Sequence, residues 1–125
     1  MIDVNLSLYL PSRMRLARLR KIVAFFALPR LRELVKIRNR EQGDYFAFSV
    51  VEVTHREDGP PELWLFPTSK VNARSVASFF EDSELDEYVT GYEQEGWALA
   101  SLVNRTWDSE ASVWGLLGDA ESEDA

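Results

Sequence analysis

The fold class of this chain is decided by residues 31–54, LRELVKIRNREQGDYFAFSVVEVT. Their second half, from Tyr45 to Thr54, is rich in aromatic and β-branched residues, which favour strands. REQGD at 40–44 is typical of a hairpin turn. Residues 30–40 are ambiguous, because their apolar spacing fits a helix or a strand. The turn favours the strand, and we therefore predict a β-hairpin.

Other segments are predicted to be strands of the same sheet. DVNLSLYL at 3–10 alternates polar and apolar residues, as a strand with one buried face does. LWLFP at 63–67 is a short strand that ends at a proline. WALASLV at 97–103 and ASVWGLL at 111–117 predict a final hairpin across NRTWDSE.

Two segments are predicted to be helical. Between residues 13 and 26 the apolar residues recur at helical spacing, so we expect an amphipathic helix with a basic outer face and Ser12 as its N-cap. Residues 71–96 are predicted to be mostly helical, with Ser83 capping the second half and Gly96 ending it. Trp97 is then expected to begin the next strand inside the core.

This order of elements predicts an α+β fold. We expect a single-layer antiparallel or mixed sheet of about five to six strands, with two to three helices packed on one face. A length of 125 residues suits one domain, which we place at 1–117. Residues 118–125, GDAESEDA, are acidic and lack large apolar side chains, so they are predicted to be a disordered tail.

Charge is distributed unevenly along the sequence. The chain carries a formal net charge of −7, yet residues 13–40 hold ten of its fourteen Lys and Arg residues and one acid, Glu33. Residues 41–125 hold four bases and nineteen acids. Such asymmetry indicates an electrostatic partner, either internal or external.

Motifs for catalysis and metal binding are missing from the sequence. It contains no cysteine, glycine-rich phosphate loop, GxSxG, HExxH or zinc spacing. We therefore predict that the protein is not an enzyme and uses no metal or cofactor. The single histidine, His55, lies in THREDG beside two acids, where a metal site or a general base is the alternative to a solvent-facing turn residue.

One interpretation of the basic stretch is internal charge balance. Its bases would lie beside acidic neighbours within one molecule or across a homodimer. Each exposed ion pair would contribute less than about 1 kcal/mol. The acids considered for this role are Glu81, Asp82, Glu84, Asp86 and Glu87.

The function we predict assigns the main role to the acidic part of the chain. A small acidic domain without a catalytic motif suits a protein that binds and neutralises a basic partner, since complementary charge speeds association and selects the partner. This type is similar to bacterial immunity and antitoxin proteins, which are often small and acidic. The predicted partner-binding residues are Glu84, Asp86, Glu87, Trp107 and Asp108.

The alternative is peripheral binding to an anionic surface, a membrane or nucleic acid, through the basic amphipathic helix 13–26. The residues that would carry it are Arg13, Arg18, Arg20 and Lys21. Both ligands are disfavoured, because the acidic remainder of the chain would be repelled by DNA or anionic lipid, and nucleic-acid-binding domains usually have a basic net charge. No signal peptide or apolar run of about 20 residues is found, so a cytoplasmic location is predicted.

Overall fold

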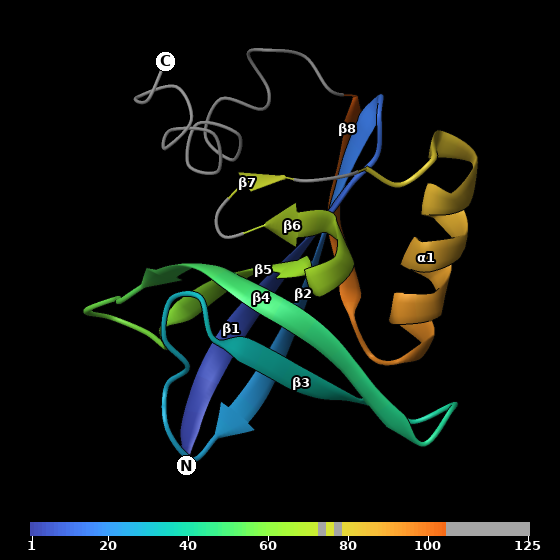
Figure 1. Ribbon diagram of the computed structural model, residues 1–125. Coiled ribbons are helices and arrows are strands. Elements are labelled where there is room, and N and C mark those ends of the chain that lie inside the picture. The colour runs from blue at the N-terminus through green and yellow to red at the C-terminus, as the bar shows by residue number, and fades with distance from the viewer. Residues whose placement is uncertain (73–74, 77–78, 105–125) are drawn as a thin grey trace, which may run out of the picture.

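The computed structural model describes residues 1–72, 75–76 and 79–104, and no side chain from 70 to 78. Most of these residues belong to a six-stranded sheet (Figure 1). Its strands are β1 (Ile2–Pro11), β2 (Arg15–Phe25), β3 (Leu34–Asn39), β4 (Asp44–Thr54), β5 (Glu62–Pro67) and β8 (Ala98–Asn104). The strand predicted within residues 30–40 is confirmed as β3.

One α-helix, α1 (Asp82–Gln94), is found among the described residues. It stands along one face of the sheet beside β2 and β8 (Figure 1). The chain reaches it through a 3-10 turn, η1 (Thr68–Lys70), and a small separate sheet of β6 (Val71–Asn72) and β7 (Ser75–Val76). The predicted sheet of five to six strands in an α+β fold is confirmed, whereas the two to three predicted helices are not.

The six strands follow the order β3-β4-β5-β1-β2-β8. β1 and β2 form one hairpin, and β3 and β4 form the predicted one through REQGD. β1 and β5 pair in parallel, with Leu6 opposite Leu63 and Leu8 opposite Leu65. All other neighbours are antiparallel, so the sheet is mixed.

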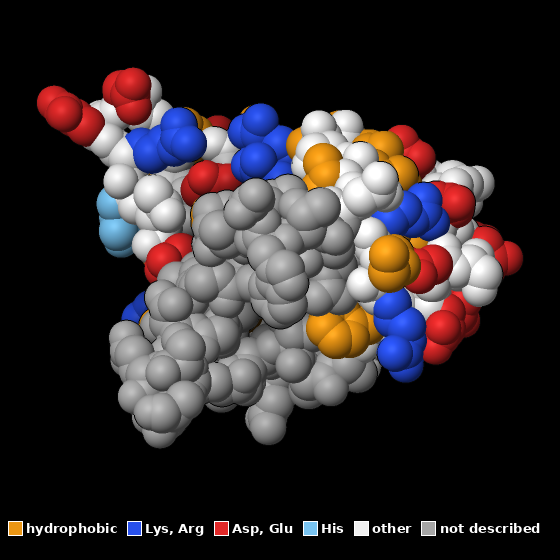
Figure 2. All heavy atoms as spheres, turned by 90° about the horizontal axis from the view of Figure 1, so that it is seen from above, with side chains coloured by type: hydrophobic (Ala, Val, Ile, Leu, Met, Phe, Trp, Pro, Cys, Tyr) orange, Lys and Arg blue, Asp and Glu red, His pale blue; other side chains and the backbone are white. Residues whose placement is uncertain are grey.

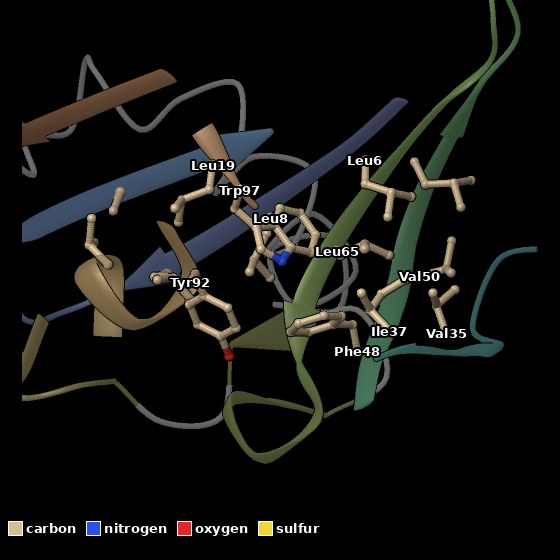
Figure 3. Packing of buried hydrophobic residues seen from close by; sticks show 14 of the residues in the cluster. Leu6, Leu8, Leu19, Val35, Ile37, Phe48, Val50, Leu65, Tyr92 and Trp97 are labelled. Atoms are coloured by element: carbon tan, nitrogen blue, oxygen red, sulfur yellow. The ribbon is translucent and has the colours of Figure 1, made fainter. Parts of the chain in front are cut away.

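The main core lies between α1 and the face of the sheet that it covers (Figure 3). Alternate residues of each strand point to this face, as the period of two requires. The helix contributes Leu85, Val89 and Tyr92, all buried. Each fully buried leucine contributes about 1.5–3 kcal/mol of transfer free energy. Sheet residues of this core include Leu6, Leu8, Leu19, Phe48, Val50, Leu65 and, at the end of α1, Trp97.

Residues of the opposite parity form a second buried cluster on the other face of the sheet. Its members are Tyr9, Leu16, Val51 and Phe66, with Trp64 packed against them. The Tyr9 ring lies 5.4 Å from the Trp64 ring and 5.7 Å from the Phe66 ring, measured between centroids. Both faces of the central strands therefore carry apolar side chains.

The prediction of a helix at 13–26 is wrong, because Arg15–Phe25 is strand β2. β2 pairs along both of its edges, with β1 and with β8, and these pairings override its local periodicity. The helical spacing arose from side chains that do not share a face. Leu16 and Leu19 are buried in different clusters, while Ile22 is 65% exposed.

Ser12 does not cap a helix but closes the β1–β2 turn. Its backbone N–H donates to the carbonyl of Arg15 at 2.9 Å, and its Oγ accepts the Arg15 N–H at 3.0 Å. The Ser12 hydroxyl also donates to Oδ1 of Asp82 at 2.5 Å. This side chain therefore joins the turn to the first residue of α1.

Only part of the segment 71–96 is helical. α1 begins at Asp82 with Glu81 as its N-cap, so the prediction of Ser83 as the cap is wrong: Ser83, two residues further on, lies inside the helix. Its end is as predicted, because Gly96 adopts a φ of +97° and donates its N–H to the carbonyl of Glu93 at 3.1 Å. Trp97 is buried, as expected.

The predicted C-terminal hairpin is described only in its first strand. That strand is β8, and it pairs with β2. Residues 111–117 and the predicted tail 118–125 lie outside the described residues.

Candidate functional site

The solvent side of α1 is strongly acidic. The sequence Asp82–Gln94 contains five acids and no base. Because the apolar residues of the helix point into the core, most of these acids are exposed. Figure 2 shows acidic side chains gathered at the right, where α1 lies, with Lys and Arg side chains among them.

The start of α1 is fastened to the β1–β2 turn. Asp82 accepts hydrogen bonds from the Ser12 hydroxyl and from the Met14 N–H, the latter at 3.0 Å. The Arg15 guanidinium donates to the backbone carbonyl of Asp82 at 2.9 Å. The bond from Ser12, followed by that from Met14, lowers the pKa of the Asp82 carboxyl. An ionised acid in the first turn also interacts favourably with the helix dipole.

Glu95, whose carboxylate is buried, joins the end of α1 to the β3–β4 turn. It accepts the backbone N–H groups of Arg40 at 2.6 Å and Glu41 at 3.2 Å. Its own carbonyl accepts hydrogen bonds from Nζ of Lys21 at 2.8 Å and from the Arg40 guanidinium at 3.2 Å. Cations stabilise this end of a helix. Burial, and next the charge of Arg40, lower the pKa of Lys21.

An open cleft of about 400 Å³ lies between α1 and the β3–β4 turn. We call it the acidic cleft, because carboxylate side chains line it from both sides. Glu41 belongs to the turn, and Glu84, Glu87 and Glu95 belong to α1 or its end. Glu41, Glu84 and Glu87 are exposed, so the cleft presents negative charge to the solvent.

Beside the polar side chains of Asn39 and Gln42, aromatic side chains line the acidic cleft. They are Phe46, Tyr88 and Tyr92. The Phe46 and Tyr92 rings pack with their centroids 4.9 Å apart. Tyr88 is 43% exposed, so part of its ring is open to a ligand.

Tyr92 has a buried ring and a hydroxyl without a hydrogen-bond partner among the described residues. The residue is 8% exposed. In Figure 3 its hydroxyl points away from Leu19 and Trp97, on the side opposite the core. Burial, with a smaller contribution from Tyr88, raises the pKa of Tyr92 to about 12. The hydroxyl therefore stays protonated at neutral pH.

The structure separates the predicted partner-binding residues. Glu84 and Glu87 line the acidic cleft. Asp86 does not, and its carboxylate lies 3.3 Å from the Arg15 guanidinium. Trp107 and Asp108 lie outside the described residues.

Sequence reasoning missed Tyr88, Gly91 and Tyr92 as lining residues of the cleft. A signal was present, because Tyr88 lies four positions after Glu84, and Gly91 four after Glu87, which places each pair on one side of a helix. The wall of the cleft opposite α1 had no such signal, since its position depends on how the β3–β4 turn approaches the helix.

The basic residues proposed for an anionic surface do not form one face. Arg18 and Arg20 lie on the face of β2 opposite α1, whereas Lys21 lies on the α1 side. Nε of Arg13 is 3.9 Å from the Glu81 carboxylate, and Arg18 pairs with Glu62 at 3.1 Å. Arg20 is exposed. The pairs with Glu81 and Asp86 agree with charge balance inside one molecule.

A second polar cluster surrounds Glu62 on the sheet face opposite α1. The Ser7 hydroxyl donates to Oε2 of Glu62 at 2.6 Å, and the Arg18 guanidinium lies 3.1 Å from the same oxygen. Arg56 lies 3.6 Å from the other oxygen. Because both carboxylate oxygens already have partners within the protein, this cluster stabilises the pairing of β1 with β5 and is a weaker candidate for a ligand site.

His55 follows β4 in an exposed loop. Within residues 1–72, 75–76 and 79–104, no group of three or more His, Cys, Asp or Glu side chains is placed to hold a metal ion. No helix in the same part of the chain is both long and apolar enough to cross a membrane.

In comparisons with known proteins, the chain matches no family model, no curated protein and no solved structure.

Proposed function

We propose that this protein is a small acidic protein-binding domain that neutralises a basic partner, in the manner of an inhibitor or immunity-like protein. The observation that carries the proposal is the acidic cleft, where exposed carboxylates and aromatic rings converge from α1 and the β3–β4 turn. Partner and domain would meet along this side of the molecule. The mechanism is steric: the bound domain covers the basic surface that the partner needs.

Electrostatics supports this choice of surface. The bases of β2 and the β3–β4 turn that lie nearest α1 already have partners, because Arg15 pairs with Asp86 and Arg40 with Glu95. Glu84 and Glu87 have no ion pair with another described residue, and both line the cleft. Unpaired charge at the rim of an interface accelerates association with an oppositely charged protein.

Aromatic side chains supply the expected anchors of the interface. Trp107, the predicted anchor, lies outside the described residues, and its role stays a prediction. In the described part of the chain, Tyr88 is the candidate anchor, because it is partly exposed and lies in the cleft wall. Tyrosine is enriched among residues that dominate binding energy.

Affinity capture with matched variants tests the proposal. Wild-type protein, the double variant Glu84→Gln/Glu87→Gln and the control Glu93→Gln are immobilised and exposed to nuclease-treated lysate of the source organism at low and moderate salt. Glu93 is an exposed acid on the same helix that does not line the cleft. We expect a basic protein on the wild-type and control beads that is lost from the double variant.

The proposal fails if the double variant retains the same proteins as the wild type. It also fails if the retained material is nucleic acid or lipid. That second outcome would favour the anionic-surface alternative, which stays a prediction that the contacts of Arg13, Arg18 and Lys21 do not support. The possible homodimer likewise stays a prediction.

A further inference from the structure

Gly91 occupies a position in α1 where nothing in the fold requires a glycine. It lies inside the helix, where glycine is the least favourable residue after proline. A Cβ atom built there would meet no atom of a neighbouring element within 4 Å among the described residues, and the residue is not among those with a positive φ. Alanine would fit and would favour the helix. The missing side chain therefore needs an explanation outside packing and backbone geometry.

The location of Gly91 supplies this explanation, because it lines the acidic cleft. A side chain at this position would project into the space between α1 and the β3–β4 turn. Proteins commonly give up stability at sites where a ligand needs room. The glycine keeps that part of the cleft open.

The Tyr92 side chain, nine-tenths buried and without a hydrogen-bond partner among the described residues, is a second feature directed into the cleft. Its hydroxyl is a polar group on a residue that is 8% exposed and lines the same cleft. The oxygen itself is open to the cleft, since Nε1 of Trp97 is the one buried side-chain N or O atom without a hydrogen-bond partner among the described residues. A ligand group in the cleft would form a hydrogen bond with this hydroxyl.

We propose that the acidic cleft binds the guanidinium group of one arginine side chain, presented by the basic partner. This inference rests on the proposed function and names the group that the partner inserts. A volume of about 400 Å³ suits a side chain rather than a single small ion. Glu84 and Glu87 would accept its N–H groups, and the Tyr92 hydroxyl would accept another.

Arginine is favoured over lysine by the aromatic wall. The guanidinium group is planar, stacks on aromatic faces and donates in a fixed fork that matches carboxylates. Tyr88 offers an exposed ring beside Glu84 and Glu87 for such stacking. A lysine ammonium is a compact and strongly hydrated charge that gains less from a flat wall.

The test is an NMR titration of the full chain with Nα-acetyl-arginine amide. The matched probes are the corresponding citrulline and lysine compounds, since citrulline has the same shape without the charge. We expect amide shifts confined to residues of the cleft, such as Tyr88 and Glu95. Binding of the arginine compound should be at least about tenfold tighter than that of citrulline, because a hydrogen-bonded charge is lost.

Variants distinguish the cleft from general attraction by an acidic protein. Gly91→Leu fills the cleft and should abolish the saturable shifts, whereas Gly91→Ala should weaken binding while raising the melting temperature. Tyr92→Phe should weaken binding about tenfold, the effect of one hydrogen bond to a charged group. Glu93→Gln, with the same loss of charge as a cleft variant, should leave the affinity unchanged.

Outcomes of this test are separate from those of the lysate experiment. Equal shifts with the citrulline compound, or shifts that survive in Gly91→Leu, would overturn the arginine pocket even if a basic protein is captured. Saturable binding of the arginine compound together with unselective capture would instead uphold the pocket and remove the support for a protein partner. Tighter binding of the lysine compound would also overturn the assignment.

Discussion

The backbone N–H of Arg40 donates to the buried carboxylate of Glu95 at 2.6 Å. This bond joins the β3–β4 turn to the end of α1, two elements that face each other across the acidic cleft. Figure 1 shows the turn approaching the lower end of the helix. The turn is therefore held to the end of α1 by the Glu95 carboxylate, together with the bond from the Arg40 guanidinium to the Glu95 carbonyl.

Removing that side chain should loosen the turn and destabilise the protein. In Glu95→Ala the N–H groups of Arg40 and Glu41 lose their acceptor, and we expect the free energy of unfolding to fall by about 2–3 kcal/mol, as for hydrogen bonds to a buried charge. Urea denaturation measures the loss. Glu93→Gln, at an exposed neighbouring position, should change stability by less than about 0.5 kcal/mol. Equal effects for the two variants would show that Glu95 does not fasten the turn.

Arg32 should tolerate glycine better than any β-branched residue. It adopts a φ of +70°, a conformation that L-residues avoid at a cost of about 1–2 kcal/mol. Its N–H donates to the carbonyl of Val50 at 2.8 Å, which holds the start of β3 in place. Arg32→Gly should be neutral or stabilising by up to about 1 kcal/mol, while Arg32→Val should be destabilising. Thermal unfolding measures the change in melting temperature of both variants. A higher melting temperature for Arg32→Val would contradict the assigned backbone conformation.

Tyr92 should make the protein less stable in alkali. Below pH 10 both the folded and the unfolded chain keep the phenolic proton. Above pH 10 the unfolded chain loses it, while the folded chain retains it up to a pKa of about 12, so stability falls as the pH rises. The full change corresponds to roughly 2–3 kcal/mol.

The variant Tyr92→Phe isolates this contribution. The difference in unfolding free energy between wild type and variant should be constant at neutral pH and should shift in favour of the variant between pH 10 and 12. Urea titrations at several pH values measure it. A pH-independent difference would mean that the hydroxyl titrates normally and is well solvated.

Glu62 should be essential for stability on the other face of the sheet. In Glu62→Ala, Ser7 and the half-buried Arg18 lose their common acceptor, and we expect a loss of about 2–4 kcal/mol. Glu62→Gln keeps the shape and one acceptor, so its loss should be smaller. Chemical denaturation compares the two. If alanine cost no more than glutamine, the carboxylate would not be what holds β1 to β5.

The sequence predicted those parts of the fold that depend on local signals. The β3–β4 hairpin followed from its turn residues, and the end of α1 followed from Gly96. Strand β2 was missed, because its assignment depends on pairing with β1 and β8, which no local pattern contains. Lys21 illustrates the difficulty: a charged side chain on the core face of a strand is understandable only once the carbonyl of Glu95 is placed beside it.

The candidate site was predictable to a similar extent. Charge density selected Glu84 and Glu87, and both line the cleft, while their role in binding stays a prediction. The same criterion selected Asp86, whose pairing with Arg15 depends on the β1–β2 turn meeting the start of α1. The same criterion could not select Tyr92, because tyrosine carries no charge at neutral pH. Tyr92 lines the cleft only because the β3–β4 turn, distant in the sequence, lies opposite α1.

The parallel pairing of β1 with β5 constrains how the chain can fold. The β1–β2 and β3–β4 hairpins bring together residues close in sequence and can form early, whereas Leu6 must find Leu63 across the whole intervening chain. Closing so long a loop precedes any gain from the contact, which slows folding. During synthesis the edge of β1 that faces away from β2 stays unpaired until residues 62–67 have emerged. Pairing of β1 with β5, which joins the β1–β2 hairpin to strands β3, β4 and β5, is the expected rate-limiting step.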